Sequence, residues 1–416
     1  MAGIAAAALL SSLLSPAPAP GQAAVSPLLS QVTGARAYGH VLELSQRIGP
    51  HVAGTPEDRT SGAYIARQLA NDGYAVEWQP FPFPFFAVRA VAVEVLSHPA
   101  VAVHPHAMMY SPSSPAGGIT ADLVDVGLGR PEDVREKALR GKIALILRGT
   151  LQFREKASNV AAAGAVAAII YNSLPEEFGG LVGRDATIPV VALSGAEGLQ
   201  LFDLVHAGTV TVHLNVQTQN EQRTTWNIIG TKRGERDPGR VLVVGAHRDT
   251  VEGAPGANDN TSGVAVALEA AEVLRQTSLA ATVRFVFFGA EEEGLYGSDY
   301  FVKHMGPGQV IGMVNLDMEG VGERLQLSTY QGSDALVTLA ARLADQLGIR
   351  VQVARSSGSD HVNFERAGVP VVFLFRPDDP EFDTPRDTVD RVDPRLLEVS
   401  GRLATAIILA IAGDGR

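Results

Sequence analysis

Residues 219–416 carry their apolar side chains in continuous runs, and not in alternation with polar ones. The runs span residues 241–246, 283–288, 310–316 and 369–375. Runs of this length that are rich in valine and phenylalanine are typical of strands buried on both faces. Between the first two runs, Thr261 or Ser262 is expected to cap a helix that continues to about Arg275 with one apolar stripe. The pattern predicts an α/β fold in which helices flank a mostly parallel central sheet.

Residues 87–218 have a different pattern, made of short β-branched runs. These runs lie at residues 91–95, 143–147, 167–170, 189–192 and 210–216, and an alanine-rich helix is expected at 153–164. The pattern predicts a small β-rich domain inserted into the larger one. His104 and His106 are interpreted as loop residues and not as a pair of metal ligands.

Residues 25–86 precede this insert and are expected to form one domain with residues 219–416. Within them, residues 32–69 favour two helices and residues 74–78 favour a strand. The alternating prolines and phenylalanines of residues 80–84 indicate a rigid extended link outside helices and strands. A chain of 416 residues is long enough to form two such domains.

Residues 1–24 are expected to be a signal peptide or a disordered leader. An apolar run at residues 4–14 is followed by an alanine- and proline-rich stretch, and this run is too short to span a bilayer. We therefore expect an exported protein, either secreted or periplasmic. No later run is long and apolar enough for a membrane helix, so no membrane insertion is expected.

The composition excludes several kinds of site. The chain has no cysteine, which excludes disulfides, thiolate zinc sites and a cysteine nucleophile. The 34 Lys and Arg against 45 Asp and Glu give a net charge of −11, which argues against nucleic acid as a partner. Any bound metal must be held by histidine, aspartate and glutamate.

Acids or a histidine follow each of the four predicted strands, and one acid precedes the predicted helix. In chain order they are His247, Asp249, Asp259, Glu291, Glu292, Asp317 and Asp383. In open α/β sheets ligands bind outside the carboxyl ends of the strands, so these side chains are expected to meet. Because so many carboxylates repel one another when they are buried together, they either point apart into solvent or have cations between them. Oxygen and imidazole ligands suit zinc, or manganese and cobalt, and two ions about 3.5–4 Å apart would satisfy the cluster.

Four motifs around these residues resemble those of the co-catalytic di-zinc aminopeptidases, a family that also holds glutamate carboxypeptidases and metal-free transferrin receptors. The motifs are Gly245-Ala246-His247-Arg248-Asp249, Gly256-Ala257-Asn258-Asp259-Asn260-Thr261-Ser262-Gly263, Gly289-Ala290-Glu291-Glu292-Glu293-Gly294 and Asn315-Leu316-Asp317-Met318. The insert resembles the protease-associated domain at residues 122–124, 141–145, 156–164 and 188–191. The resemblance implies a zinc exopeptidase fold with an inserted protease-associated domain.

The resemblance implies two zinc ions, with manganese or cobalt as alternatives. His247 and Asp317 would hold one ion, Glu292 the other, and Asp259 would bridge them. Asp383 stands where the family usually has a histidine that completes the second position. Four carboxylate ligands carry a charge of −4 and cancel two dications, so we expect a preference shifted towards harder metals.

The resemblance also implies two catalytic roles. Asp249 would accept the imidazole hydrogen of His247 and so fix the tautomer of the ring. Glu291 would be the general base that takes a proton from a metal-bound water. The peptide bond between Asp259 and Asn260 is expected to be cis, as in the family.

Three further residues are expected near the substrate. Phe382 replaces a tyrosine that helps to hold the oxyanion in the family. Asp360 and His361 match a family segment near the substrate pocket. We expect His361 to line this pocket or to have a structural role, with a replacement metal ligand as the alternative.

The implied function is that of a di-zinc metallo-exopeptidase, foremost an aminopeptidase that hydrolyses N-terminal residues from peptides through a metal-bound hydroxide. A carboxypeptidase of the same fold is an alternative, because the loops that set specificity are not determined by the fold. A non-catalytic, receptor-like peptide-binding protein on the same scaffold is another alternative. Peptides are the expected partners, and the sequence leaves the oligomeric state open.

Overall fold

A computed structural model describes residues 27–305, 310–331, 334–356 and 358–413. The chain divides into two compact units, and the second of them, Pro84–Arg223, interrupts the first in sequence. The first unit runs as far as Phe83 and resumes at Thr224. The predicted insert, 87–218, lies within the second unit, and the predicted leader, 1–24, lies outside the described residues.

A mostly parallel sheet forms the centre of the first unit, in the order β12-β11-β13-β10-β8-β9-β7. The pairs β13–β10, β10–β8, β8–β9 and β11–β12 are parallel, whereas β11–β13 and β9–β7 are antiparallel. The strands are β7 Thr211–Lys232, β8 Asp237–His247, β9 Ala281–Phe288, β10 Val310–Asp317, β11 Leu325–Thr329, β12 Val351–Arg355 and β13 Val371–Phe375. The four strands predicted from continuous apolar runs are β8, β9, β10 and β13, and their prediction is confirmed.

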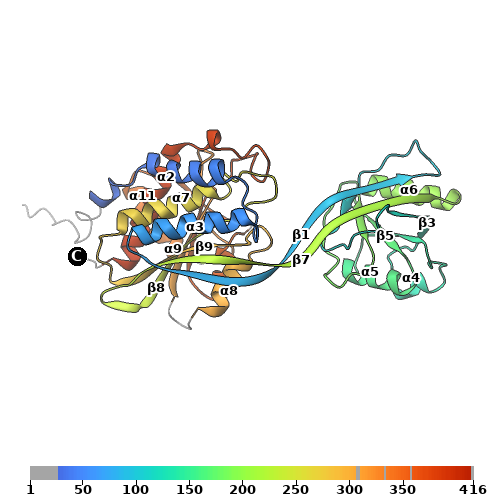
Figure 1. Cartoon of the computed structure of the whole chain (residues 1–416), viewed down its shortest axis with the longest axis horizontal. Coiled ribbons are helices and arrows are strands. Elements are labelled where there is room, and N and C mark those ends of the chain that lie inside the picture. Colours follow the sequence, from blue (N-terminus) through green and yellow to red (C-terminus); the bar gives the residue numbers. More distant parts are fainter. Residues whose placement is uncertain (1–26, 306–309, 332–333, 357, 414–416) are drawn as a thin grey trace, which may run out of the picture. The chain divides into compact units, whose positions relative to one another are not determined.

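Helices cover both faces of this sheet, and Figure 1 shows α2, α7 and α11 together over one of them. Alternate residues of β8 enter different cores: Leu242 packs with α7 and α11, whereas Val243 packs with Phe301 and Phe364 of the opposite face. The first face carries α2 Gly34–Val41, α3 Pro56–Asn71, α7 Thr261–Leu274, α9 Asp334–Gln346 and α11 Pro394–Ala412. The second carries α8 Tyr296–His304 and α10 His361–Arg366, and two short helices, η1 Leu42–Ile48 and η2 Val389–Arg391, complete the unit. Burial on both faces explains the continuous apolar runs.

Helix α7 differs from its prediction in its cap and in its burial. Its N-cap is Asn260, whose Oδ1 accepts the main-chain N–H of Gly263 at 3.0 Å, so Thr261 and Ser262 lie inside the first turn. The helix is buried on nearly all sides and has no single apolar stripe. The reason is its position between the sheet and α2 and α11, which leaves it no solvent-facing side.

Residues 80–84 lie inside a strand, β1 Ala75–Val95, and the prediction of an extended link outside regular structure is wrong. β1 pairs with β7. Successive N–H groups of a strand point to opposite edges, so Pro80, Pro82 and Pro84 all place their missing donor on the same edge. Prolines that share one edge leave the ladder bonds of the other edge intact, which is why a strand can tolerate three of them.

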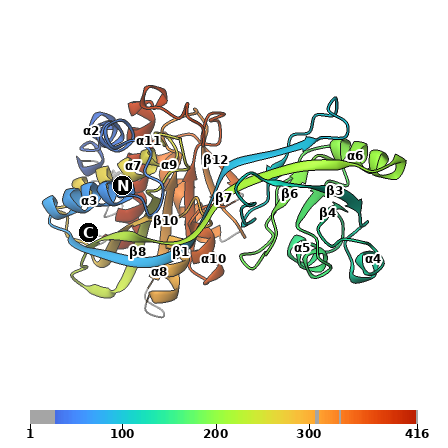
Figure 2. The same ribbon diagram turned by 45° about the vertical axis from the view of Figure 1, so that its right-hand side comes forward.

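In the second unit the strand order is β7-β3-β4-β5-β6-β2, and β3 pairs with residues 211–214 at the start of β7. Helix α6 packs on one face, and α4 and α5 pack on the other (Figure 2). The elements are β2 His106–Ala107, β3 Ile119–Asp125, β4 Ile143–Leu147, β5 Ala167–Tyr171, β6 Val190–Leu193, α4 Pro131–Arg135, α5 Phe153–Ala162 and α6 Gly195–Ala207. His106 belongs to the short strand β2 and contacts Glu177, and His104 contacts Glu197, so the two histidines bind separate carboxylates.

No helix within the described ranges combines the length and the apolar character that crossing a membrane requires.

Candidate metal centre

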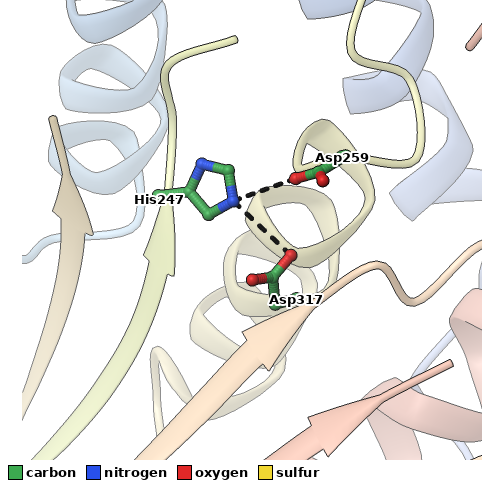
Figure 3. A group of neighbouring side chains, drawn as sticks. All are labelled: His247, Asp259 and Asp317. Carbon is green, nitrogen blue, oxygen red and sulfur yellow. Dashed lines mark ion pairs between the residues drawn. The ribbon is translucent and has the colours of Figure 1, made fainter. Parts of the chain in front are cut away.

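Two neighbouring parallel strands and the start of α7 bring three ligand side chains together. β8 ends at His247 and β10 ends at Asp317, and their pairing places Asn315 opposite Gly245. The two strand ends therefore meet at one edge of the sheet, next to Asp259, which precedes the N-cap of α7. Nε2 of His247 lies 3.0 Å from Oδ1 of Asp259 and 3.5 Å from Oδ1 of Asp317, and Figure 3 shows the ring nitrogen facing both carboxylates.

Three overlapping groups of potential ligands extend this arrangement. In each group the ligand atoms lie within 4.8 Å of one another. The groups are His247, Asp259 and Asp317; His247, Glu291 and Glu292; and Asp259, Glu292 and Asp383. All six metal and base residues predicted at this edge are thus brought together, although they come from segments up to 136 residues apart in sequence (383 − 247).

The geometry of these residues fits metal ions. In tetrahedral coordination with bonds of about 2.0–2.2 Å, neighbouring ligand atoms lie about 3.4 Å apart, close to the two distances from His247. Oδ1 of Asp259, Oδ1 of Asp317 and Oε1 of Glu292 are buried and accept no hydrogen bond. Buried carboxylate oxygens without partners are costly, and a cation between them removes that cost.

The protonation of the cluster supports the same conclusion. Burial raises the pKa of Asp259 to about 7, and the nearby carboxylate of Asp317 adds to this rise. Burial also raises the pKa of Glu291 and of Glu292 well above the ordinary value. Burial by itself lowers the pKa of His247, but the surrounding carboxylates, Glu291 first, bring it well above its usual range. The site therefore binds extra protons unless metal ions supply the positive charge.

The orientation of His247 differs in one detail from the prediction. Nδ1 of the ring donates to the main-chain oxygen of Asp249 at 3.2 Å, whereas the Asp249 carboxylate is 4.0 Å away. That carboxylate instead accepts the main-chain N–H groups of Glu291 and Glu292, at 3.1 and 3.3 Å. The predicted tautomer still holds, because a proton on Nδ1 leaves Nε2 free to bind a metal. Asp249 therefore also fixes the turn that carries Glu291 and Glu292.

The predicted cis peptide bond between Asp259 and Asn260 is present. Positive φ angles occur at Ala290, just before Glu291, at Met318, just after Asp317, and at Asp383 itself. Such angles are uncommon for residues other than glycine and cluster at functional sites.

Asp360 and His361, two residues predicted near the substrate, are fully buried, which agrees with the structural role expected as one alternative for His361. The side chain of His361 stacks on Phe373, with ring centroids 4.5 Å apart, and its Nε2 lies 3.2 Å from the hydroxyl of Ser356. His361 also belongs to none of the three ligand groups. Asp360 has no exposed surface, and burial raises its pKa to about 7. The sequence match could not show this, because the burial comes from packing of α10 against β13. Phe382, by contrast, is 44% exposed beside Asp383.

Several polar residues that hold the ligands were not found from the sequence. Ser359 donates to Oδ2 of Asp317 at 2.7 Å and accepts from the side chain of Asn315 at 2.9 Å. Asp387 accepts the main-chain N–H groups of Asn258 and Asp259. Asp387 lies only four residues after the predicted ligand Asp383, and this closeness in sequence was the available signal.

The fold and this ligand set fit a metal-dependent hydrolase. The family model described as peptidase family M28 matches residues 227–408, and that of the PA domain matches residues 117–201. Aminopeptidase YwaD of Bacillus subtilis (strain 168) is 34% identical over 395 residues, which cover 89% of this chain and 83% of that protein. The chain therefore belongs to peptidase family M28, like this aminopeptidase, and carries an inserted PA domain.

Two solved structures extend the comparison to the whole fold. The aminopeptidase from Aneurinibacillus sp. strain AM-1 is similar with a TM-score of 0.81 and 34% identity, over 93% of this chain and 96% of that chain. The zinc aminopeptidase BSAP from Bacillus subtilis is similar with a TM-score of 0.71 and 30% identity, over 92% of this chain and 96% of that chain. The predicted fold class, with its inserted domain, is thus confirmed.

Proposed function

We propose that this protein is an aminopeptidase that works with two zinc ions at the carboxyl edge of its sheet. The observation that carries the proposal is the place of Asp259, which belongs both to the group with His247 and Asp317 and to the group with Glu292 and Asp383. One carboxylate can therefore serve two metal positions. The names of similar proteins, among them a zinc aminopeptidase, support both the metal and the reaction.

Different residues would bind the metal ions and transfer the proton. His247, Asp259 and Asp317 would hold one ion, and Asp259, Glu292 and Asp383 the other. Zinc in such positions activates water at neutral pH and polarises the carbonyl group that is attacked. In the proposed reaction Glu291 accepts a proton from the attacking water and later donates it to the leaving amine as the C–N bond breaks.

The surroundings of Glu291 suit a general base. Its carboxylate belongs to a ligand group with His247 and Glu292, which supports a role beside a metal-bound water. Its main-chain N–H donates to Asp249, which fixes the turn. Burial raises its pKa, so the carboxylate has a stronger affinity for a proton than an exposed glutamate.

The charge of the site favours a free N-terminus over a free C-terminus. Asp259, Glu291, Glu292, Asp317 and Asp383 carry −5 when ionised, two zinc ions carry +4, and the remainder is −1. This excess attracts the ammonium group of a peptide and repels a terminal carboxylate.

A matched set of peptides tests the proposal. The same tetrapeptide is offered with a free N-terminus, with an acetylated N-terminus and with an amidated C-terminus. We expect cleavage of the first and third and none of the second. Cleavage that requires a free C-terminus would instead indicate a carboxypeptidase.

Variants of one turn test the role of Glu291. Glu291→Gln should lower kcat by about 10²–10⁴-fold while peptide binding is retained, because general bases contribute factors of this size. Glu293→Gln, in the same turn but outside the three ligand groups, is the control and should stay active. A Glu291→Gln variant that keeps full turnover would contradict the general-base role.

We further propose that the protein is exported. Support comes from the apolar run at residues 4–14 and the alanine- and proline-rich stretch after it. N-terminal sequencing of the protein recovered from culture medium and from cell fractions tests the proposal, which requires extracellular or periplasmic protein that has lost its leader.

A further inference from the structure

The two proposed metal positions differ in the chemistry of their ligands. The first position, His247, Asp259 and Asp317, includes an imidazole nitrogen. The second, Asp259, Glu292 and Asp383, consists of carboxylate oxygens alone. The protein thus has two neighbouring ligand groups that share one residue but differ in the chemistry of the others.

The second position is more than a group of surface acids. Oδ1 of Asp259 and Oε1 of Glu292 are buried and accept no hydrogen bond, and both belong to this group. Among the described residues, His247 is the one basic side chain at ion-pair distance from Asp259, and it belongs to the first position. The nearby Arg248 is engaged by Asp58. The second position therefore contains no basic side chain of its own, and its buried oxygens are arranged to receive a metal ion.

The two positions also differ in exposure. His247 is 1% exposed and Asp317 7% exposed, so the first position is enclosed. Asp383 is an exposed residue on the loop that follows β13. An ion in the second position can leave past Asp383, whereas an ion in the first is surrounded by buried side chains.

We propose that the second position takes a hard, exchangeable divalent cation such as Mn²⁺, whereas the first retains Zn²⁺. This inference rests on the proposed two-metal function. Imidazole suits zinc, while carboxylate and water oxygens suit manganese and magnesium. Without an imidazole the second position loses most of its preference for zinc, and the two sites together favour one ion of each kind.

The test measures metal content directly. The full-length, zinc-saturated protein is dialysed against millimolar Mn²⁺, and zinc and manganese per chain are then measured by mass spectrometry. Loss of the free Mn²⁺ signal in electron paramagnetic resonance gives the number of bound manganese ions independently. We expect one zinc and one manganese per chain. Retention of two zinc ions, or replacement of both, would overturn the inference.

A pair of variants assigns the exchange to one residue. Asp383→His adds an imidazole to the second position and should lower manganese uptake relative to zinc by about tenfold or more, because even changes outside the direct ligands alter metal affinity by about 10–100-fold. Asp378→His adds the same ring to the same loop outside the ligand groups and should exchange like the wild type. Equal exchange in Asp383→His and the wild type would overturn the inference.

The outcomes also separate this inference from the proposed function. If the protein binds two zinc ions and cleaves peptides, but manganese replaces neither zinc ion or both, the proposed function stands and the inference is wrong. A chain that binds a single ion at zinc saturation contradicts both.

Discussion

The carboxylate of Asp387 holds the main chain of Asp259: its Oδ2 accepts the Asp259 N–H at 2.9 Å. Its Oδ1 accepts the N–H of Asn258 at 2.8 Å, so both oxygens hold the segment that leads into α7. Asp387 is fully buried and lies 128 residues from Asp259. It therefore fixes the carboxylate that both proposed metal positions share, from the far end of the sequence.

Replacing Asp387 should weaken metal binding without removing a ligand. In Asp387→Asn one oxygen remains as an acceptor, but the amide NH₂ faces a main-chain N–H that it cannot satisfy. We expect metal affinity to fall about 10–100-fold, measured by competition with a chelator. Asp390→Asn, an exposed carboxylate three residues further on, is the control and should bind metal normally. Unchanged affinity in Asp387→Asn would show that the main chain is held by other contacts.

A buried ion pair supports the other side of the site. Nη1 of Arg248 lies 2.6 Å from Oδ1 of Asp58, and both side chains are completely buried. Arg248 also donates to the hydroxyl of Ser61 and to the main-chain oxygen of Trp226. Because Arg248 follows His247 directly, these contacts tie the end of β8 to α3.

Breaking this pair should destabilise the first unit strongly. Asp58→Ala leaves a buried guanidinium without its counter-charge, which typically costs about 3–5 kcal/mol. Asp378→Ala, which breaks the exposed pair with Arg324, should cost less than about 1 kcal/mol. Both tryptophans of the chain, Trp78 and Trp226, belong to the first unit, so their fluorescence during urea unfolding reports on this unit alone. An equal decrease in the free energy of unfolding in Asp58→Ala and Asp378→Ala would contradict the role of the buried pair.

The elements that the sequence predicted correctly are those with a local signal. Four continuous apolar runs predicted the central strands, and the acids after them predicted which residues meet, because parallel strands share an edge. The strand through Pro80 was missed because prolines are rare inside strands, and its partner β7 lies far away in the sequence. Asn260 was missed as a cap because Thr261 and Ser262 offered the same chemistry one residue later. The roles of Asp387 and Ser359 depend on contacts across long stretches of chain, which no local pattern encodes.

Removing the metal should make stability depend on pH through the buried acids. In the metal-free protein the pKa of Asp259 is about 7, above its unfolded value of about 3.9. Its contribution to stability is therefore fully present below about pH 3.9 and is lost as the pH rises through 7. Bound zinc supplies the missing positive charge, so the rise in Tm on adding zinc should be larger at pH 7.5 than at pH 5.5. A rise in Tm that is equal at both pH values would contradict this account. Asp259→Asn is the matched variant, and adding zinc should raise its Tm by less than that of the wild type at both pH values.

A buried histidine outside the ligand groups, His40, should have the opposite pH dependence. Nδ1 of His40 lies 2.7 Å from the hydroxyl of Tyr64, and burial lowers the pKa of His40 to about 4. Because the unfolded value is about 6.5, the neutral ring stabilises the fold fully above pH 6.5, and this contribution is lost as the pH falls towards 4.

His40→Gln removes this titration while keeping a side chain that can bond to Tyr64. Between pH 6.5 and 4 the free energy of unfolding of the wild type should therefore fall more steeply, by up to about 1.4 kcal/mol per pH unit, which corresponds to one proton. The measurement uses urea unfolding of both proteins in metal-free form, followed by tryptophan fluorescence, so that loss of metal at low pH does not contribute. Parallel curves for the two proteins would mean that His40 takes up no proton on unfolding in this range. A difference confined to this window would identify His40 as a source of acid sensitivity that is independent of the metal centre.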